Sequence, residues 1–141
     1  MDDLKFNLFV GTQAAATLVL LASAALWPGP WNTQRMVGLA LLMVGMVLVS
    51  TARFQLGKSF SITPEAKKLV THGLYSKIRN PIYLFGTIAI AGVFLILQIP
   101  PLWMLLGALA VLQVLRADKE ARVLEAKFGE QYRAYRRQTW F

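Results

Sequence analysis

The sequence predicts an all-α integral membrane protein with four transmembrane helices and a C-terminal cytosolic amphipathic helix, folded as a single membrane domain over residues 1–141. Three observations predict this class. The chain is 56% hydrophobic, and it has no charged residue in 6–34, 36–52 or 80–115. Its cations gather in the segments that border these runs. A membrane helix needs roughly 20 mostly apolar residues, so the uncharged runs are long enough for several spans.

The three uncharged runs predict four helices. The first supports one helix, which ends near the turn signal Trp27-Pro28-Gly29-Pro30-Trp31, and the second supports a helix over about 34–54. The third is too long for one span and is interrupted by Pro100-Pro101, so we expect helices over 81–99 and 102–115, the last extending beyond the bilayer edge. A soluble bundle is disfavoured, because so small a chain cannot bury the whole third run on all sides.

The positions of the cations predict the orientation. Segment 53–79 holds six Lys and Arg residues and segment 116–141 holds seven, whereas the turn Trp27–Arg35 holds one and the turn Gln98–Pro101 none. Cytoplasmic loops of membrane proteins carry an excess of Lys and Arg. We therefore expect both basic segments and both termini on the cytosolic side, with the two short turns outside.

The net charge of +8 is explained by this pattern and by attraction to anionic lipid headgroups, so we expect the bilayer as a partner and no nucleic acid. Cysteine is absent and His72 is the single histidine, which predicts no metal site. The uncharged runs contain no ionisable residue for an ion relay, which disfavours transport. Oligomeric state stays open.

The long connection 57–80 is expected to be ordered, because it contains apolar anchors. Thr63-Pro64-Glu65 resembles a helix start, and Asn80-Pro81 repeats this signature at the mouth of the third span, with Asn80 as the cap. A helix N-terminus attracts anions, and Arg79 adds a fixed charge, so a carboxylate or phosphate could bind there. An ordinary interfacial cap with a snorkelling arginine is an equal alternative.

After Leu115 the pattern becomes that of an amphipathic helix. Arg116 and Glu120 are i, i+4 neighbours, so Glu120 either pairs with Arg116 or faces the anion site across a cleft. In the second case a ligand with a carboxylate and a cationic amine, such as S-adenosylmethionine, would bridge the two segments. Gly129 is expected to break the helix. An apolar stripe continues along it, and we favour its lying in the headgroup interface. The stripe comprises Leu124, Phe128, Tyr132 and Tyr135.

Two motifs resemble those of a known family. They are LVTHGLYSKIRNPIY at 69–83 and EARVLEAKFGEQYRAYRR at 120–137. The first resembles the pattern L-V-T-x-G-x-Y-x-x-x-R-H-P-x-Y, and the second E-E-x-x-L-x-x-x-F-G-x-x-Y-x-x-Y, of the isoprenylcysteine carboxyl methyltransferase family, which is related to the membrane phospholipid methyltransferases. The resemblance covers a methyltransferase-like cofactor-binding region at 67–138; the first two spans match only as hydrophobic helices.

The resemblance implies an S-adenosylmethionine-dependent methyltransferase. Arg116 would bind the methyl acceptor and Glu120 would complete the cofactor site. The cofactor contacts carried over from the motifs are Leu69, Val70, Gly73, Tyr75, Arg79, Asn80, Pro81, Ile82, Tyr83 and Glu120. In two positions the chain departs from the pattern: Asn80 stands where the family has histidine, and Ala121 where it has a second glutamate.

The acceptor is expected to be lipophilic, with a tail that reaches the site from the bilayer. A carboxylate acceptor is favoured, because it is already ionised and needs no base, and Asn80 supplies no imidazole. The alternatives are a phospholipid or amine N-methyltransferase and a non-catalytic membrane binding protein that retains the fold, which the departures at Asn80 and Ala121 favour slightly.

Overall fold

The structure is a computed structural model that describes residues 3–57 and 69–141, and its regular elements there are helical, which confirms the predicted all-α class. The helices begin and end close to the predicted positions, and the helix start expected at Thr63-Pro64-Glu65 lies outside the described residues. The elements are α1 (Asp3–Leu26), α2 (Thr33–Leu56), the 3₁₀ turn η2 (Gly73–Ser76), α3 (Pro81–Leu97), α4 (Leu102–Phe128) and α5 (Glu130–Gln138).

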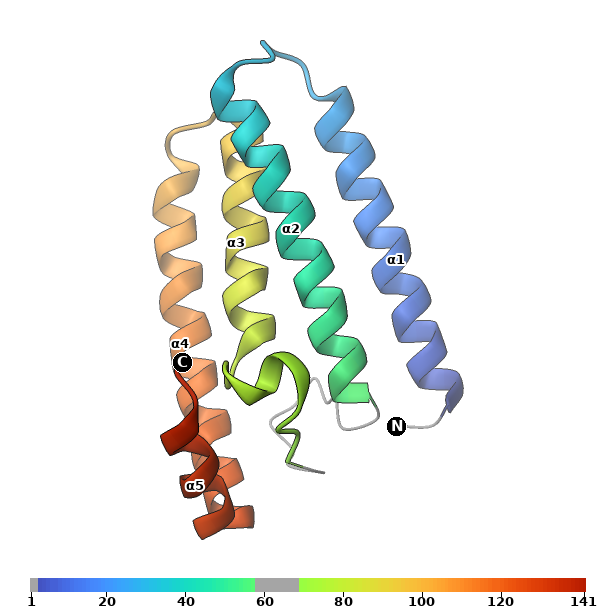
Figure 1. Ribbon diagram of the computed structural model, residues 1–141. Helices are drawn as coiled ribbons and strands as arrows, with labels where there is room; N and C mark the ends of the chain where they lie inside the picture. Colours follow the sequence, from blue (N-terminus) through green and yellow to red (C-terminus); the bar gives the residue numbers. More distant parts are fainter. Residues whose placement is uncertain (1–2, 58–68) are drawn as a thin grey trace.

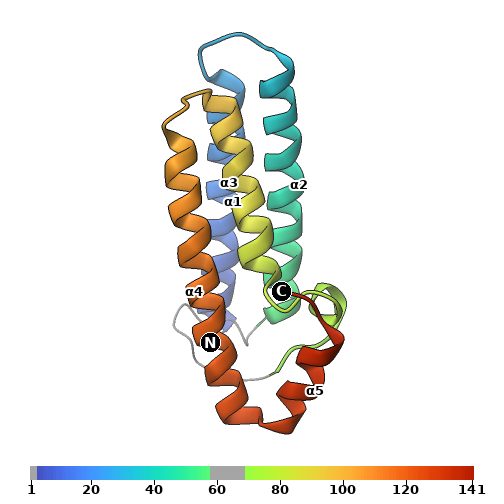
Figure 2. The ribbon, with the colours of Figure 1, turned by 90° about the vertical axis from the view of Figure 1, so that its left-hand side faces the viewer.

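The four long helices lie side by side, and their connections divide between the two ends of the bundle (Figures 1 and 2). The α1–α2 and α3–α4 turns lie together at one end. The start of α1, the segment 69–80, α5 and the residues after α5 lie toward the other end. The basic segments 69–80 and 116–141 therefore share one end, as the charge pattern predicts.

Two of the described helices, α1 and α2, are long and apolar enough by themselves to cross a membrane. Helix α3 is apolar over 17 residues, near the lower limit for a span. Helix α4 is apolar only in its first half, because Arg116 begins a charged half that continues to Phe128. The four-span arrangement therefore stays a prediction where α3 and α4 are concerned.

Helices α2 and α3 form the tightest pair, because small residues let their backbones approach closely. A Cβ atom placed on Gly92 would lie 2.6 Å from the carbonyl oxygen of Gly38 and 2.6 Å from the backbone nitrogen of Leu42. Farther along, a Cβ on Gly45 would lie 2.8 Å from the nitrogen of Ala89. Small residues at such positions are the usual means of close helix packing in membranes. The α2–α3 pair is thus the most closely packed part of the bundle.

We expect Gly92→Ala to destabilise the protein by about 1–3 kcal/mol, because the added methyl group must push two backbones apart. Gly86→Ala is the matched control on the same helix, since a Cβ there meets nothing within 4 Å. Thermal unfolding of both variants in the same detergent measures the difference. Equal melting temperatures for the two variants would show that α2 and α3 are not packed this closely.

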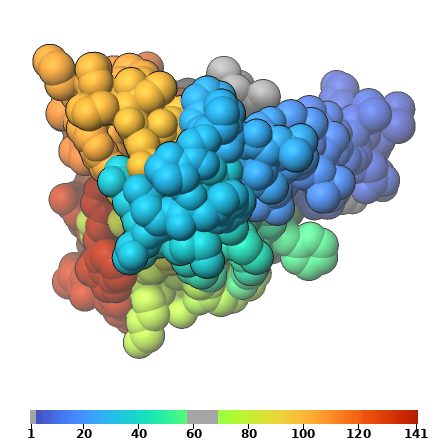
Figure 3. Space-filling view, turned by 90° about the horizontal axis from the view of Figure 1, so that it is seen from above, coloured from blue at the N-terminus to red at the C-terminus, as the bar shows by residue number. Residues whose placement is uncertain are grey.

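Helix α1 meets α2 near both of its ends: Arg53 of α2 donates to Gln13 and lies 4.9 Å from the Phe9 ring centroid, and Arg35 bonds to its C-terminal end. Ala24 is its buried residue, and Figure 3 shows the helix extending away from the others. At the C-terminal end Arg35, only 1% exposed, donates from Nη2 to the carbonyl oxygens of Ala24 at 3.0 Å and Trp27 at 2.7 Å. Its guanidinium also lies 3.9 Å from the ring centroid of Trp31. Arg35 thus satisfies carbonyls that the end of a helix leaves unpaired. The sequence shows this residue only as a turn cation.

Candidate functional site

Three of the predicted site residues meet where α3 begins and α4 leaves its apolar half. The Tyr83 hydroxyl donates to Oε1 of Glu120 at 2.5 Å, and the Arg116 guanidinium carbon lies 5.6 Å from the Tyr83 ring centroid. Arg116 and Glu120 reach the same tyrosine because they are one helical turn apart on α4. Glu120 thus accepts a hydrogen bond from the phenol, and Arg116 lies beside the same ring.

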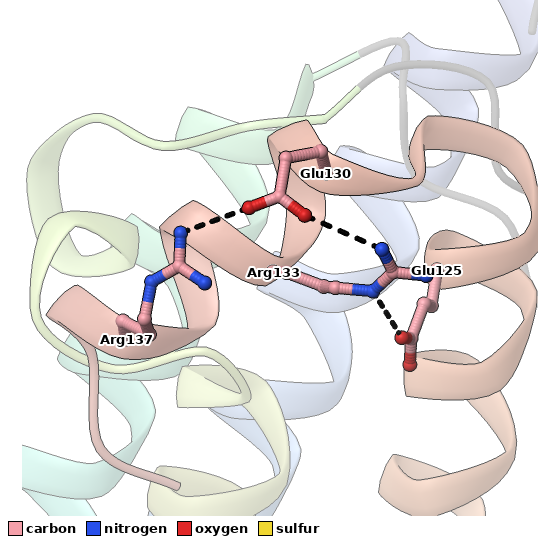
Figure 4. A network of polar contacts seen from close by, with 4 residues as sticks. All are labelled: Glu125, Glu130, Arg133 and Arg137. Atoms are coloured by element: carbon pink, nitrogen blue, oxygen red, sulfur yellow. Dashed lines mark hydrogen bonds and ion pairs between the residues drawn. The ribbon is translucent and has the colours of Figure 1, made fainter.

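Glu120 differs from the other acids of α4 and α5 in its partner. Asp118 pairs with Arg122 at 2.7 Å on the exposed face of α4. Glu125 and Glu130 belong to an exposed network in which both bond to Arg133, and Glu130 also bonds to Arg137 (Figure 4). That network joins the two sides of the bend at Gly129. Glu120 is half-buried and accepts a hydrogen bond from a neutral donor, the Tyr83 hydroxyl.

A second group of predicted residues forms an apolar cluster at the end of α2. Val70 and Tyr75 are buried there with Ala52, and Ile82 packs against them together with Leu56 and Leu74. Leu69, half-buried, precedes Val70. Because Ile82 and Tyr83 are consecutive at the start of α3, the cluster and the polar group of Tyr83, Arg116 and Glu120 adjoin. The structure thus brings both predicted motifs to one place.

Gly73 has a conformational role that the motif alone does not reveal. Its φ is +61°, in the left-handed region that favours glycine, and a Cβ on it would lie 2.4 Å from the Gln55 side chain. Gln55 Oε1 accepts a hydrogen bond from the backbone N–H of Leu74 at 2.8 Å. Gln55 therefore fastens the turn η2 to α2. In the sequence, the only indication of this role for Gln55 is that it is a polar residue at the end of an apolar run.

The start of α3 differs from the predicted cap. Asn80 occupies the N-cap position and Pro81, nearly inaccessible, follows at the first helical position, but the Asn80 side chain makes no capping hydrogen bond. The backbone N–H groups of Arg79 and Asn80 donate instead to the carbonyl oxygen of Phe141, at 2.8 and 3.0 Å. These two N–H groups are therefore not donors for an anion. The residues that remain for such a ligand are the Arg79 and Asn80 side chains and the first N–H groups of α3, at Ile82 and Tyr83.

The headgroup interface that the sequence favours for the tyrosines of α5 is wrong for Tyr132 and Tyr135. They are 2% and 7% exposed and pack on the protein, because α5 folds back after Gly129. The Tyr135 hydroxyl donates to the backbone oxygen of Tyr75 at 2.6 Å. Burial raises the pKa of Tyr135 to about 12, with Tyr132 adding to the effect, and burial also raises the pKa of Tyr75. These phenols stay protonated at physiological pH, so they serve as donors and not as bases.

Chemically, the site combines one exposed cation, one half-buried carboxylate and an adjoining apolar cluster at the end of a helical bundle. Arg116 can hold an anionic group, because it is exposed beside the apolar half of α4. Glu120 can accept hydrogen bonds from a cationic or hydroxyl-bearing ligand. The site thus suits two ligands side by side, one with an anionic group at Arg116 and one with a cationic or hydroxyl group at Glu120.

Comparison with known proteins identifies the class. A family model described as phospholipid methyltransferase matches residues 33–131, which is more than half of the chain. The chain belongs to this family. No curated protein sequence matches.

Among solved structures, the chain is similar to the eukaryotic intramembrane Ras methyltransferase, isoprenylcysteine carboxyl methyltransferase, solved without a monobody. The TM-score is 0.63 at 24% sequence identity, over 92% of this chain and 50% of that chain. At this identity the likeness shows the fold, and the chain spans about half the length of that protein. The resemblance inferred from the motifs at 69–83 and 120–137 is confirmed at the level of the family.

Proposed function

We propose that the protein transfers a methyl group from S-adenosylmethionine to a lipophilic acceptor, most favourably a carboxylate. The observation that carries this proposal is the convergence of Arg116 and Glu120 on Tyr83, at the end of the bundle where the apolar cluster also lies. When bound, S-adenosylmethionine would supply a methyl group on a sulfonium, which leaves as a neutral thioether when an acceptor lone pair bonds to the methyl carbon.

The residues present fit this cofactor in the chemistry of their donor set. Glu120 would accept hydrogen bonds from the ammonium or ribose hydroxyl groups of the cofactor, because a half-buried carboxylate has acceptor capacity beyond its bond to Tyr83. The side chains of Arg79 and Asn80 and the first N–H groups of α3 would hold the methionyl carboxylate. Val70, Tyr75 and Ile82 would offer apolar contact from the neighbouring cluster, with Leu69 and Gly73 shaping the segment.

Arg116 would bind the acceptor. It lies one helical turn before Glu120, nearer the apolar half of α4, so it would meet a headgroup whose tail stays in the bilayer. Its planar guanidinium suits a carboxylate, which it can bind with two parallel hydrogen bonds. An ionised carboxylate needs no general base. Binding and orientation with exclusion of water are then the whole contribution required of the chain.

A phospholipid amine is the second candidate acceptor, and the description of the matching family model favours it. An amine must lose a proton before it can attack. No imidazole stands at position 80, and burial keeps the phenols of Tyr75 and Tyr135 protonated. Among the described residues assigned to the site, the Glu120 carboxylate is the group that could accept this proton. The carboxylate acceptor therefore requires less of the observed side chains.

The test is methyl transfer by the purified protein in detergent, with S-adenosylmethionine labelled on the methyl group. A prenylated cysteine with a free carboxylate and a phosphatidylethanolamine vesicle are offered in parallel, and the labelled product is treated with base. A methyl ester releases its label as volatile methanol, whereas a methylated amine keeps it. Cofactor binding measured by calorimetry without any transfer, to these acceptors or to a whole lipid extract, would identify a non-catalytic binding protein.

The site is proposed to face the cytosol, with both termini on the same side, because the basic segments share one end of the bundle. Reporters of cytosolic or external location, fused after Gly57 and after Phe141, are expected to give the cytosolic signal in both cases. A third reporter placed in the α1–α2 turn at Gly29 serves as the opposite control. An external signal after Phe141 would separate α5 from the cytosol and contradict the proposed orientation.

A further inference from the structure

The segment that leads into α3 is fastened by the end of the chain. The backbone N–H of Trp140 donates to the carbonyl oxygen of Lys77 at 3.0 Å, and the N–H groups of Arg79 and Asn80 donate to the oxygen of Phe141. Ile78 and Trp140 thereby form a short parallel bridge. We name residues 139–141 the C-terminal clasp. Figure 2 shows the chain after α5 returning to the start of α3.

Two side-chain hydrogen bonds between α5 and the segment before α3 extend this attachment. The Tyr135 hydroxyl donates to the oxygen of Tyr75 at 2.6 Å, in a buried position, and Nη1 of Arg79 donates to the oxygen of Arg136 at 3.3 Å. These bonds span more than fifty residues of sequence. They hold both ends of the segment 75–80, which has little regular structure of its own between η2 and α3.

We propose that the C-terminal clasp and Tyr135 position segment 75–80 for the cofactor, and that they control cofactor affinity without contacting the cofactor. The inference rests on the proposed function, in which Tyr75, Arg79 and Asn80 belong to the cofactor site. Without the clasp, the backbone groups of Lys77, Arg79 and Asn80 would turn to water and the segment would gain conformational freedom. Binding would then have to order it, which lowers affinity.

The C-terminal clasp does not hold Arg116, the residue proposed to bind the methyl acceptor. Arg116 lies on α4, whose position follows from its own helical hydrogen bonds and from its packing beside α3. The clasp bonds to segment 77–80 and not to α4. Loss of the clasp is therefore expected to change the dissociation constant of the cofactor and leave the KM of the acceptor within about threefold.

The first test removes a single backbone donor. Trp140→Pro eliminates the N–H that bonds to Lys77, and Thr139 at φ −125°, ψ 154° already has the conformation that a following proline requires. Trp140→Ala is the matched control, because it keeps the N–H and removes an indole that is 57% exposed. We expect Trp140→Pro to weaken S-adenosylmethionine binding by about fivefold to twentyfold and Trp140→Ala by less than about twofold. Hydrogen exchange at Arg79 and Asn80 should quicken only in the proline variant.

The second test removes a side-chain donor. It keeps the proposal testable if the Trp140→Pro variant does not fold. Tyr135→Phe deletes the hydroxyl that bonds to Tyr75 and keeps the buried ring, whereas Tyr132→Phe makes the same change at the neighbouring buried tyrosine. We expect Tyr135→Phe to weaken cofactor binding about fivefold, Tyr132→Phe to have little effect, and acceptor KM to stay constant in both.

The outcomes distinguish failure of the proposed function from failure of the proposed role of the C-terminal clasp. An unmodified chain that fails to bind S-adenosylmethionine overturns the proposed function, and the role of the clasp with it. An unmodified chain that binds, together with Tyr135→Phe and Trp140→Pro variants whose affinity is unchanged although hydrogen exchange quickens, overturns the clasp alone. Weaker binding accompanied by an equal rise in acceptor KM also overturns it, since general loosening of the fold would then be the cause.

Discussion

Arg116→Ala is expected to lower the rate of methyl transfer by roughly tenfold to 100-fold, the range for losing hydrogen bonds to a charged group. Affinity for S-adenosylmethionine should stay within about threefold. The reason is positional: Arg116 lies over the Tyr83 ring and is exposed, whereas the carboxylate assigned to the cofactor is one turn farther along α4. An acceptor carboxylate that loses its guanidinium partner is bound less well and is less often aligned with the methyl group.

Two further variants on the same helix test whether the effect is specific to the guanidinium of Arg116. Arg116→Lys should restore only part of the activity, because an ammonium group cannot form the two parallel bonds of a guanidinium. Arg122→Ala is the control, since it removes an exposed arginine whose partner is Asp118. Initial rates and calorimetric affinities are measured on the same preparations. Loss of cofactor binding in Arg116→Ala would show that the division of roles between Arg116 and Glu120 is wrong.

The helices are predictable from the sequence because their signal is local. Uncharged runs and proline pairs determine where helices run and stop, and the boundary at Gly129 follows from one glycine between two helical patterns. The position of Arg116 and Glu120 on one face of the helix is equally local, since it needs only the helical repeat. The identity of their common neighbour is not local: Tyr83 lies thirty-seven residues before Glu120. The motif resemblance assigned both residues to one cofactor site, but it did not predict the hydrogen bond between them.

The wrong predictions share a cause. A periodic apolar stripe shows that one face of α5 avoids water, but it does not say what covers that face. Tyr132 and Tyr135 are covered by protein instead of headgroups. Asn80 has the residue type and position of a cap, yet its side chain makes no capping hydrogen bond, and the backbone N–H groups of Arg79 and Asn80 donate to Phe141. Contacts between the end of the chain and its middle leave no pattern in either segment.

Glu120→Gln is expected to weaken S-adenosylmethionine binding by roughly tenfold to 100-fold, because it removes the negative charge and keeps the shape of the side chain. Folding should be little affected, since glutamine can still accept the hydrogen bond from Tyr83. Asp118→Asn is the matched control: it makes the same change on the same helix, at an acid whose partner is the exposed Arg122.

Tyr83→Phe distinguishes a carboxylate that serves the cofactor from one that serves the tyrosine. If Glu120 binds the cofactor and Tyr83 only orients it, Tyr83→Phe should weaken binding about fivefold, and the double variant should resemble Glu120→Gln alone, because orientation of a lost charge has no further effect. The measurement is a double-mutant cycle of calorimetric affinities with thermal unfolding in parallel. If the Tyr83–Glu120 bond is merely structural, both variants will lower the melting temperature and neither will change cofactor affinity. That result would show that the cofactor binds elsewhere and not at Glu120 of α4.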